Sequence, residues 1–186
     1  MVFSCLNSAY KIEADVFTAW MRTLTRVPES VLWLLHTHQY TENNLVLQAK
    51  KSGVDKTRII FVPTLPKREH LQRLSKSDLA LDTTPVNGHT TTVDCLWAGV
   101  PVITTIGTHF ASRVSASCLK AVGLPQLITS NLSQYENLAV DLATHPQKLL
   151  RLKSRLRQQI KSCPLFDTKQ YTRNLEMAFF QMHHAL

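Results

Sequence analysis

Short apolar segments alternate along the chain with longer segments in which apolar residues recur at every third or fourth position. The short segments cover residues 2–6, 31–35, 58–62, 79–81, 100–104 and 126–128. Most of them are rich in valine, isoleucine, leucine or phenylalanine and lack the strict alternation of a half-exposed strand. Strands that helices cover on both faces have this composition, so we predict six buried, parallel β-strands.

The segments between these strands predict helices over residues 13–26, 42–52, 67–75, 90–98 and 111–122. In the first of them, Val16, Trp20 and Leu24 follow one another at helical spacing. Gly53 and Gly99 stand where glycine commonly caps the end of a helix. Repeated strand–helix–strand units with right-handed crossovers build a doubly wound sheet, so we predict an α/β fold with a Rossmann-like parallel sheet.

The pattern changes after residue 128. Helical periodicity continues over residues 133–143, 146–161 and 168–184, and no further strand is predicted between these segments. No linker rich in glycine, serine or proline divides the chain. We therefore predict a single lobe over residues 1–186, with the Rossmann-like sheet in residues 1–130 and a helical tail in residues 131–186.

The composition is that of a globular protein. Of the 186 residues, 44% are apolar and 18% are charged, which excludes a disordered or fibrous chain. The uncharged apolar runs are far too short to cross a bilayer. The cysteines form no C-x-x-C pair, which argues against a zinc ribbon or a disulfide scaffold and fits a reducing compartment; they are Cys5, Cys95, Cys118 and Cys163.

A net charge of +8 favours an anionic partner such as phosphate, nucleic acid or acidic lipid, although it also suits a merely soluble surface. The absence of G-x-G-x-x-G and G-x-x-x-x-G-K argues against a standard dinucleotide site and a P-loop. Basic and leucine residues alternate over residues 146–161. This segment is either a basic amphipathic helix for acidic lipid or a helix that packs its apolar face on the sheet.

Candidate chemistry follows the predicted strands, because ligands of an open α/β sheet bind at the carboxyl ends of its strands. Lys11 follows the first strand, and Lys67 and His70 follow the third. After the fourth strand, Gly88 permits a close backbone approach, and His89 with three threonines opens a helix. The unpaired N–H groups and the positive dipole end of such a helix form an anion site. The alternative is an ordinary threonine cap on a buried helix.

Several linked motifs resemble the O-linked N-acetylglucosamine transferase family. The most specific is Asn-Gly-His-Thr-Thr at residues 87–91, followed by Asp94 and by Leu-Trp-Ala-Gly at residues 96–99. Others, in the family's order, are Tyr-Lys-Ile at 10–12, Arg-Ile-Ile-Phe at 58–61, Pro-Lys at 66–67, Glu-His at 69–70, Ala-Ser-Arg-Val at 111–114 and Thr-Lys-Gln-Tyr at 168–171. The related fucosyl-transferring branch lacks the Gly-His-Thr-Thr form, which favours the N-acetylglucosamine branch.

The resemblance implies the C-terminal lobe of a GT-B glycosyltransferase. That family moves N-acetylglucosamine from UDP-GlcNAc to serine or threonine hydroxyls of proteins, with inversion and with neither a metal nor a cofactor. By resemblance, Lys11 is the catalytic residue that neutralises the departing diphosphate. The other UDP-binding residues that the resemblance implies are Leu65, Lys67, His70 and Arg73 around the uridine, Ser8, His89, Thr90 and Thr91 around the diphosphate, and Asp94 on the ribose.

This chain departs from the family pattern at two positions near the diphosphate. Ser8 stands where family members often have glutamine, so its shorter side chain needs a water to reach the ligand. Thr92 stands where they have glycine, and a side chain there is tolerable inside a helix.

The resemblance also sets expectations about partners. We expect acceptor proteins, together with an N-terminal catalytic lobe and tetratricopeptide repeats that this chain does not contain, so that the chain alone is inactive. We expect a cytoplasmic or nuclear protein, and neither nucleic-acid nor membrane binding. Two alternatives stay open, namely a UDP-binding module without activity and a protein that binds anionic surfaces through residues 146–161.

Overall fold

A computed structural model describes residues 1–184 and contains a six-stranded sheet in which every neighbouring pair of strands is parallel. The strand order is β3-β2-β1-β4-β5-β6. The strands are β1 (Val2–Cys5), β2 (Val31–Leu35), β3 (Ile59–Val62), β4 (Leu79–Leu81), β5 (Val102–Thr105) and β6 (Ile128–Thr129). The order of connection reverses between β1 and β4, and the gap beyond their carboxyl ends is where such sheets bind ligands.

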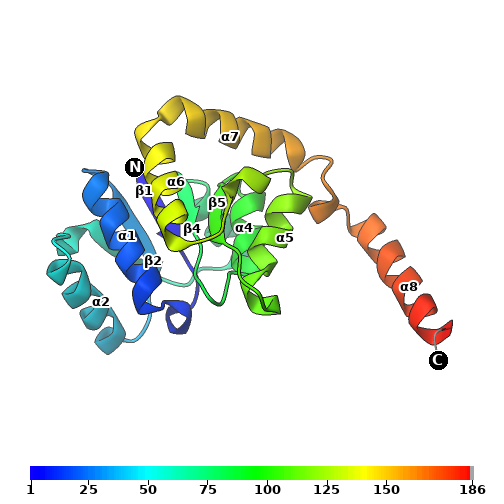
Figure 1. Cartoon of the computed structure of the whole chain (residues 1–186), viewed down its shortest axis with the longest axis horizontal. Coiled ribbons are helices and arrows are strands. Elements are labelled where there is room, and N and C mark those ends of the chain that lie inside the picture. Colours follow the sequence, from blue (N-terminus) through cyan, green and yellow to red (C-terminus); the bar gives the residue numbers. More distant parts are fainter. Residues whose placement is uncertain (185–186) are drawn as a thin grey trace.

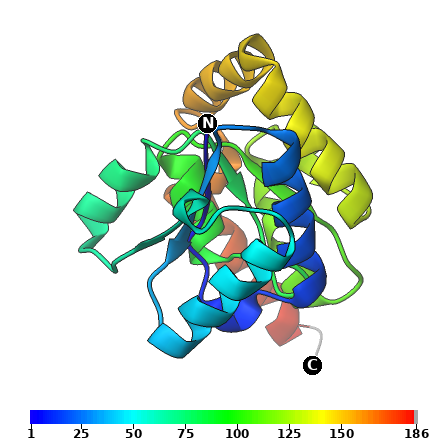
Figure 2. The ribbon, with the colours of Figure 1, turned by 90° about the vertical axis from the view of Figure 1, so that its left-hand side faces the viewer.

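Helices join and cover these strands. They are α1 (Ala14–Arg26), α2 (Gln39–Lys51), α3 (Lys67–Leu74), α4 (Thr90–Trp97), α5 (Val114–Ala121), α6 (Leu132–Thr144), α7 (Pro146–Gln159) and α8 (Thr168–His184). Helices α1 and α6 pack against each other, while α4 contacts both α3 and α5, so the sheet lies between two helical layers (Figures 1 and 2). The predicted Rossmann-like α/β fold is therefore confirmed.

The boundaries differ from the prediction at a few places for local reasons. Helix α2 begins at Gln39, three residues early, because the His38 side chain accepts a hydrogen bond from the Tyr40 amide at 3.2 Å. Helix α5 begins late, since the 3₁₀ helix Phe110–Ser112 takes up the start of the predicted segment. A second 3₁₀ helix, Pro125–Leu127, likewise delays β6.

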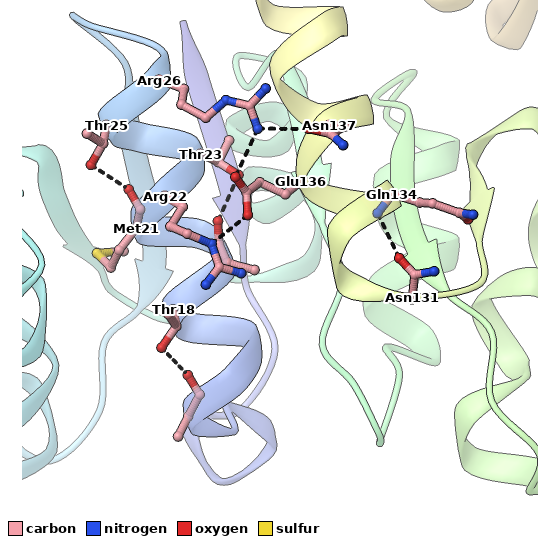
Figure 3. Close-up of polar contacts among 12 residues, drawn as sticks. Thr18, Met21, Arg22, Thr23, Thr25, Arg26, Asn131, Gln134, Glu136 and Asn137 are labelled. Atoms are coloured by element: carbon pink, nitrogen blue, oxygen red, sulfur yellow. Dashed lines mark hydrogen bonds and ion pairs between the residues drawn. The ribbon is translucent and has the colours of Figure 1, made fainter.

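Large apolar side chains fill the space between the sheet and helices α1 and α6. Trp20 of α1 and Tyr135 of α6 are fully buried and meet through a 3.0 Å hydrogen bond from Trp20 Nε1 to the Tyr135 hydroxyl. On the surface above them, Arg22 and Arg26 both donate to the Glu136 carboxylate, at 2.6 and 2.9 Å (Figure 3). Helix α6 is thus a packed part of the body, although it lies beyond residue 130.

The last two helices differ in how they contact the body. Helix α7 buries Leu149 and Leu156, and its Lys153 pairs with Asp78 at 3.1 Å. The structure therefore favours the packing interpretation of the basic segment 146–161. Helix α8 has no buried residue and projects away from the sheet (Figure 1). No helix in residues 1–184 combines the length and apolar character needed to span a bilayer.

Candidate functional site

The segments that follow β1, β3 and β4 meet at the carboxyl edge of the sheet. The 3₁₀ helix Ala9–Lys11 follows β1, and the Lys11 ammonium group donates to the Asn87 carbonyl at 2.9 Å. Helix α3 follows β3 and packs beside α4. The implied site residues fall into two groups: a loop cluster of Ser8, Lys11, His89, Thr90 and Thr91, and an α3 cluster of Leu65, Lys67, His70, Arg73 and Asp94.

The loop cluster surrounds the start of α4. His89 is the N-cap residue of α4, and within the described chain its side chain makes no capping hydrogen bond. His89 and Thr90 are exposed, whereas Thr92 is buried, so the helix begins at the surface of the protein. A helix start of this kind presents N–H donors and a partial positive charge, which suit a phosphate group. Lys11 adds a formal charge next to the same turn.

Gly88 packs too closely for any other residue. A Cβ atom at this position would lie 2.5 Å from Thr92 Oγ1 and 2.6 Å from Thr91 Oγ1. Thr92, the departure from the family pattern, is buried, and its hydroxyl lies 2.7 Å from Ser115 Oγ. The structure thus gives the Thr92 hydroxyl a partner and accounts for glycine at residue 88.

Ser8 is the member of the loop cluster that lines a surface pocket with Tyr10, His36 and Thr41, next to β2 and α2. Its side chain is exposed, and its carbonyl accepts the Lys11 amide at 3.0 Å. The backbone bond fixes Lys11 relative to Ser8, whereas the hydroxyl stays open to solvent.

The α3 cluster is organised around the Asp94 carboxylate. The Lys67 ammonium group hydrogen-bonds to Asp94 Oδ1, and His70 Nε2 lies 3.6 Å from Asp94 Oδ2. Arg73 Nη2 lies 3.3 Å from His70 Nδ1, and Arg73 Nη1 donates to the Pro63 carbonyl at 2.5 Å. Leu65 is half-buried in the segment that leads into α3. Asp94 is therefore in contact with two cationic or polar neighbours.

The surroundings of His70 favour a neutral imidazole. Partial burial lowers the pKa of His70, and Arg73 and Lys67 lower it further, while Asp94 opposes them. A neutral ring that accepts from Arg73 at Nδ1 carries its proton at Nε2, which faces Asp94. Such a flat, uncharged ring is suited to stacking on a nucleobase.

Two buried residues beneath the loop cluster carry contacts that the sequence did not assign to them. Asn7 Oδ1 accepts the Thr91 hydroxyl, and Asn7 Nδ2 donates to Thr83 Oγ1 at 2.9 Å. Asp82 Oδ1 accepts the Gly88 amide at 2.7 Å. Asn7 lies two residues after β1 and Asp82 directly follows β4, and polar residues at such positions are the available signal. Their burial became visible only in the folded chain.

The four cysteines are buried, unpaired thiols. Burial raises the pKa of Cys5 to about 12, so this thiol stays protonated at neutral pH. Within residues 1–184, no three histidine, cysteine or acidic side chains are grouped as metal ligands.

The doubly wound sheet is that of the catalytic lobe of a GT-B glycosyltransferase, as the match to a solved structure shows. An O-GlcNAc transferase mutant, K341M, of Thermobaculum terrenum matches it with a TM-score of 0.92 and 31% identity over 97% of this chain. The profile of glycosyl transferase family 41 matches residues 1–175. The chain therefore belongs to glycosyl transferase family 41.

Curated relatives agree with this assignment. The Arabidopsis thaliana protein named "Probable UDP-N-acetylglucosamine--peptide N-acetylglucosaminyltransferase SEC" is 41% identical over 97% of this chain. The Caenorhabditis elegans UDP-N-acetylglucosamine--peptide N-acetylglucosaminyltransferase is 36% identical over 98% of it. The chain spans only 19% and 16% of these two relatives and 35% of the Thermobaculum chain.

Proposed function

We propose that this chain is the UDP-GlcNAc-binding lobe of a protein O-GlcNAc transferase. The complete enzyme would move N-acetylglucosamine to serine or threonine hydroxyls of acceptor proteins, with inversion and without a metal or cofactor. One observation supports this proposal above the others. At the switch point of the sheet, the Lys11 ammonium group bonds to Asn87, just before the start of α4, where the N-cap residue His89 makes no side-chain capping hydrogen bond within the described chain. Family membership adds the donor and the reaction, since the relatives are named for them.

In this reaction an acceptor hydroxyl oxygen bonds to the anomeric carbon while the bond from that carbon to the diphosphate breaks. Negative charge grows on the departing UDP. Lys11, the first amides of α4 and the Thr90 and Thr91 hydroxyls would neutralise that charge, because preorganised donors act most strongly where charge develops. The acceptor's proton passes to a base that we expect outside this chain.

The α3 cluster would hold the nucleoside. A neutral His70 ring would stack on uracil, with Leu65 and Arg73 at the border of the base and Lys67 nearby. Asp94 would accept hydrogen bonds from the ribose hydroxyls. The contact between Lys67 and Asp94 supports this division, because it joins the proposed base and ribose contacts in one cluster.

The wider setting is also a proposal. We propose that the functional enzyme contains an N-terminal catalytic lobe and tetratricopeptide repeats in addition to this chain and works in the cytoplasm or nucleus. The second candidate is a UDP-binding module without activity.

Two binding experiments and one activity assay separate the candidates. Calorimetric titration of UDP into the chain should give saturable one-to-one binding, and liposomes of acidic lipid should not retain the chain. A chimera in which this chain replaces the matching segment of the Arabidopsis relative should transfer N-acetylglucosamine. UDP binding with an inactive chimera would favour the inactive module. Salt-sensitive liposome binding without UDP affinity would favour an anionic-surface protein.

A further inference from the structure

A carboxylate lies buried beneath the loop cluster. Asp82, the residue after β4, is 3% exposed, and its two oxygens accept four hydrogen bonds from neutral donors. Oδ1 accepts three of them, from Asn7 Nδ2 at 3.3 Å, the Thr83 amide at 2.9 Å and the Gly88 amide at 2.7 Å. Oδ2 accepts the fourth from the Thr104 hydroxyl at 2.6 Å. Moving a carboxylate out of water costs free energy, so the burial of Asp82 needs a structural or functional explanation.

Buried groups hydrogen-bond to both the backbone N–H and the backbone C=O of Gly88. Its N–H donates to Asp82, while its C=O accepts the Ser115 hydroxyl of α5 at 3.0 Å. Ser115 in turn lies 2.7 Å from the Thr92 hydroxyl. Because Gly88 immediately precedes the N-cap residue of α4, these contacts fix the direction in which the first amides of α4 point.

A second arm runs from Asp82 through Asn7. When Asn7 Nδ2 donates to Asp82, the amide oxygen of Asn7 faces the other way, and there it accepts the Thr91 hydroxyl. Asp82 is also held through its backbone, since the hydroxyl of Tyr135 on α6 donates to the Asp82 carbonyl at 2.9 Å. Asp82 thus joins β4, the loop and α6.

We infer that Asp82 is the positioning residue of the UDP site, a role that rests on the proposed function. It touches no ligand. It holds Gly88 and Asn7 so that the start of α4 is already arranged for a diphosphate before the nucleotide arrives. Burial raises the pKa of Asp82, and hydrogen bonds from Thr104, Gly88 and Thr83 oppose that rise. The role depends on the acceptor oxygen at Oδ1, which faces three of the four donors.

The choice of variants follows from this division of oxygens. Asp82→Ala removes the acceptors. Asp82→Asn keeps an oxygen toward the three N–H donors and turns its amide toward Thr104, whose hydroxyl can accept as well as donate. Thr104→Val is the matched control, because it breaks a buried hydrogen bond to Asp82 but leaves the contacts to Gly88 and Asn7.

The test combines UDP titration, thermal unfolding and amide hydrogen exchange on the ¹⁵N-labelled chain. We expect Asp82→Ala to weaken UDP at least tenfold, Asp82→Asn to stay within threefold of wild type, and Thr104→Val to lower the unfolding midpoint with affinity within twofold. A merely structural role predicts that affinity falls in step with stability in all three variants, and that result would overturn the inference.

The Gly88 amide reports on the inference without any ligand. In the free wild-type chain it should exchange at least a hundredfold more slowly than the amides of the exposed residues His89 and Thr90. Equal exchange rates would overturn the inference even if Asp82→Ala failed to fold. If the wild-type chain bound no UDP but its Gly88 amide exchanged slowly, the proposed function would fail, while the hydrogen bonds that hold Gly88 in place would be confirmed.

Discussion

The loop cluster and the α3 cluster lie side by side but are built in different ways. The loop cluster rests on buried polar residues, and Gly88 and Thr91 are held by Asp82 and Asn7. The α3 cluster is open on one side, since the Lys67 side chain that pairs with the buried Asp94 is 60% exposed. The diphosphate side therefore rests on buried hydrogen bonds, whereas the proposed uridine side includes a solvent-exposed lysine. Changes to the buried support of the loop cluster should alter both stability and UDP affinity, and changes to the exposed lysine of the α3 cluster should alter UDP affinity with little effect on stability.

The largest expected effect concerns Lys11. In the chimera, Lys11→Ala should lower the transfer rate by about 10²–10³-fold, roughly 2.7–4 kcal/mol, as for loss of one donor to a developing anion. The unfolding midpoint should not change, because the half-buried side chain donates only to a backbone carbonyl.

Lys56→Ala is the control, since Lys56 is exposed on the 3₁₀ helix Lys56–Arg58. A transfer rate near that of wild type in Lys11→Ala would remove Lys11 from the mechanism and leave the loop cluster without its cation.

The buried support of the loop cluster is tested by Tyr135→Phe. The change leaves Trp20 Nε1 and the Asp82 carbonyl without a partner. The free energy of unfolding in urea should fall by about 1–3 kcal/mol, the usual cost of a buried unpaired polar group. Tyr40→Phe is the control because Tyr40 is 71% exposed. Equal stability of the two variants would mean that the hydrogen bonds of the Tyr135 hydroxyl to Trp20 and Asp82 do not stabilise the fold.

The α3 cluster should respond in the opposite way. Lys67→Ala should weaken UDP by about tenfold, the value of one charge-assisted hydrogen bond of about 1.5 kcal/mol. The free energy of unfolding of Lys67→Ala should stay within about 1 kcal/mol of wild type, because an ion pair whose lysine is 60% exposed contributes little. Arg68→Ala, an exposed neighbour on α3, is the control for both measurements. A large loss of stability in Lys67→Ala would erase the contrast between the clusters.

The smallest expected effect is a pH dependence from His70. Because folding lowers the pKa of His70 below its ordinary value of 6.5, the folded chain binds fewer protons there than the unfolded chain. The stability that this group contributes is full above that value and is lost as the pH falls below it. Urea unfolding at pH 7.5 and pH 5.5 should show a smaller drop in His70→Gln than in wild type. Identical drops would contradict a neutral His70.

The sequence predicted the fold well because the signals for it are local. Apolar runs mark the strands, and Gly53, Gly99 and Gly123, each with positive φ, end the helices before β3, β5 and β6. The gathering of Lys11, Lys67 and His89 at one edge followed from the parallel sheet alone. The division of the chain at residue 130 stays a prediction.

The hydrogen bonds that hold Gly88 in place could not be predicted, because the residues that make them are far apart in the sequence. Ser115 meets Gly88 across 27 residues, and Asn7 meets Asp82 across 75. Nothing in a sequence says that an aspartate after a strand will be buried rather than solvated. The same holds for α8. The helix was predicted from its periodicity, but its lack of buried residues was visible only in the structure.

An amide chemical-shift titration of the ¹⁵N-labelled chain with UDP would locate the nucleotide site on the chain. We expect saturable one-to-one binding, with the largest shifts at the amides of residues 88–92 and at Lys11, followed by those at the start of α3. Saturable binding with shifts confined to α7 or α8, or no binding at millimolar UDP, would contradict this expectation.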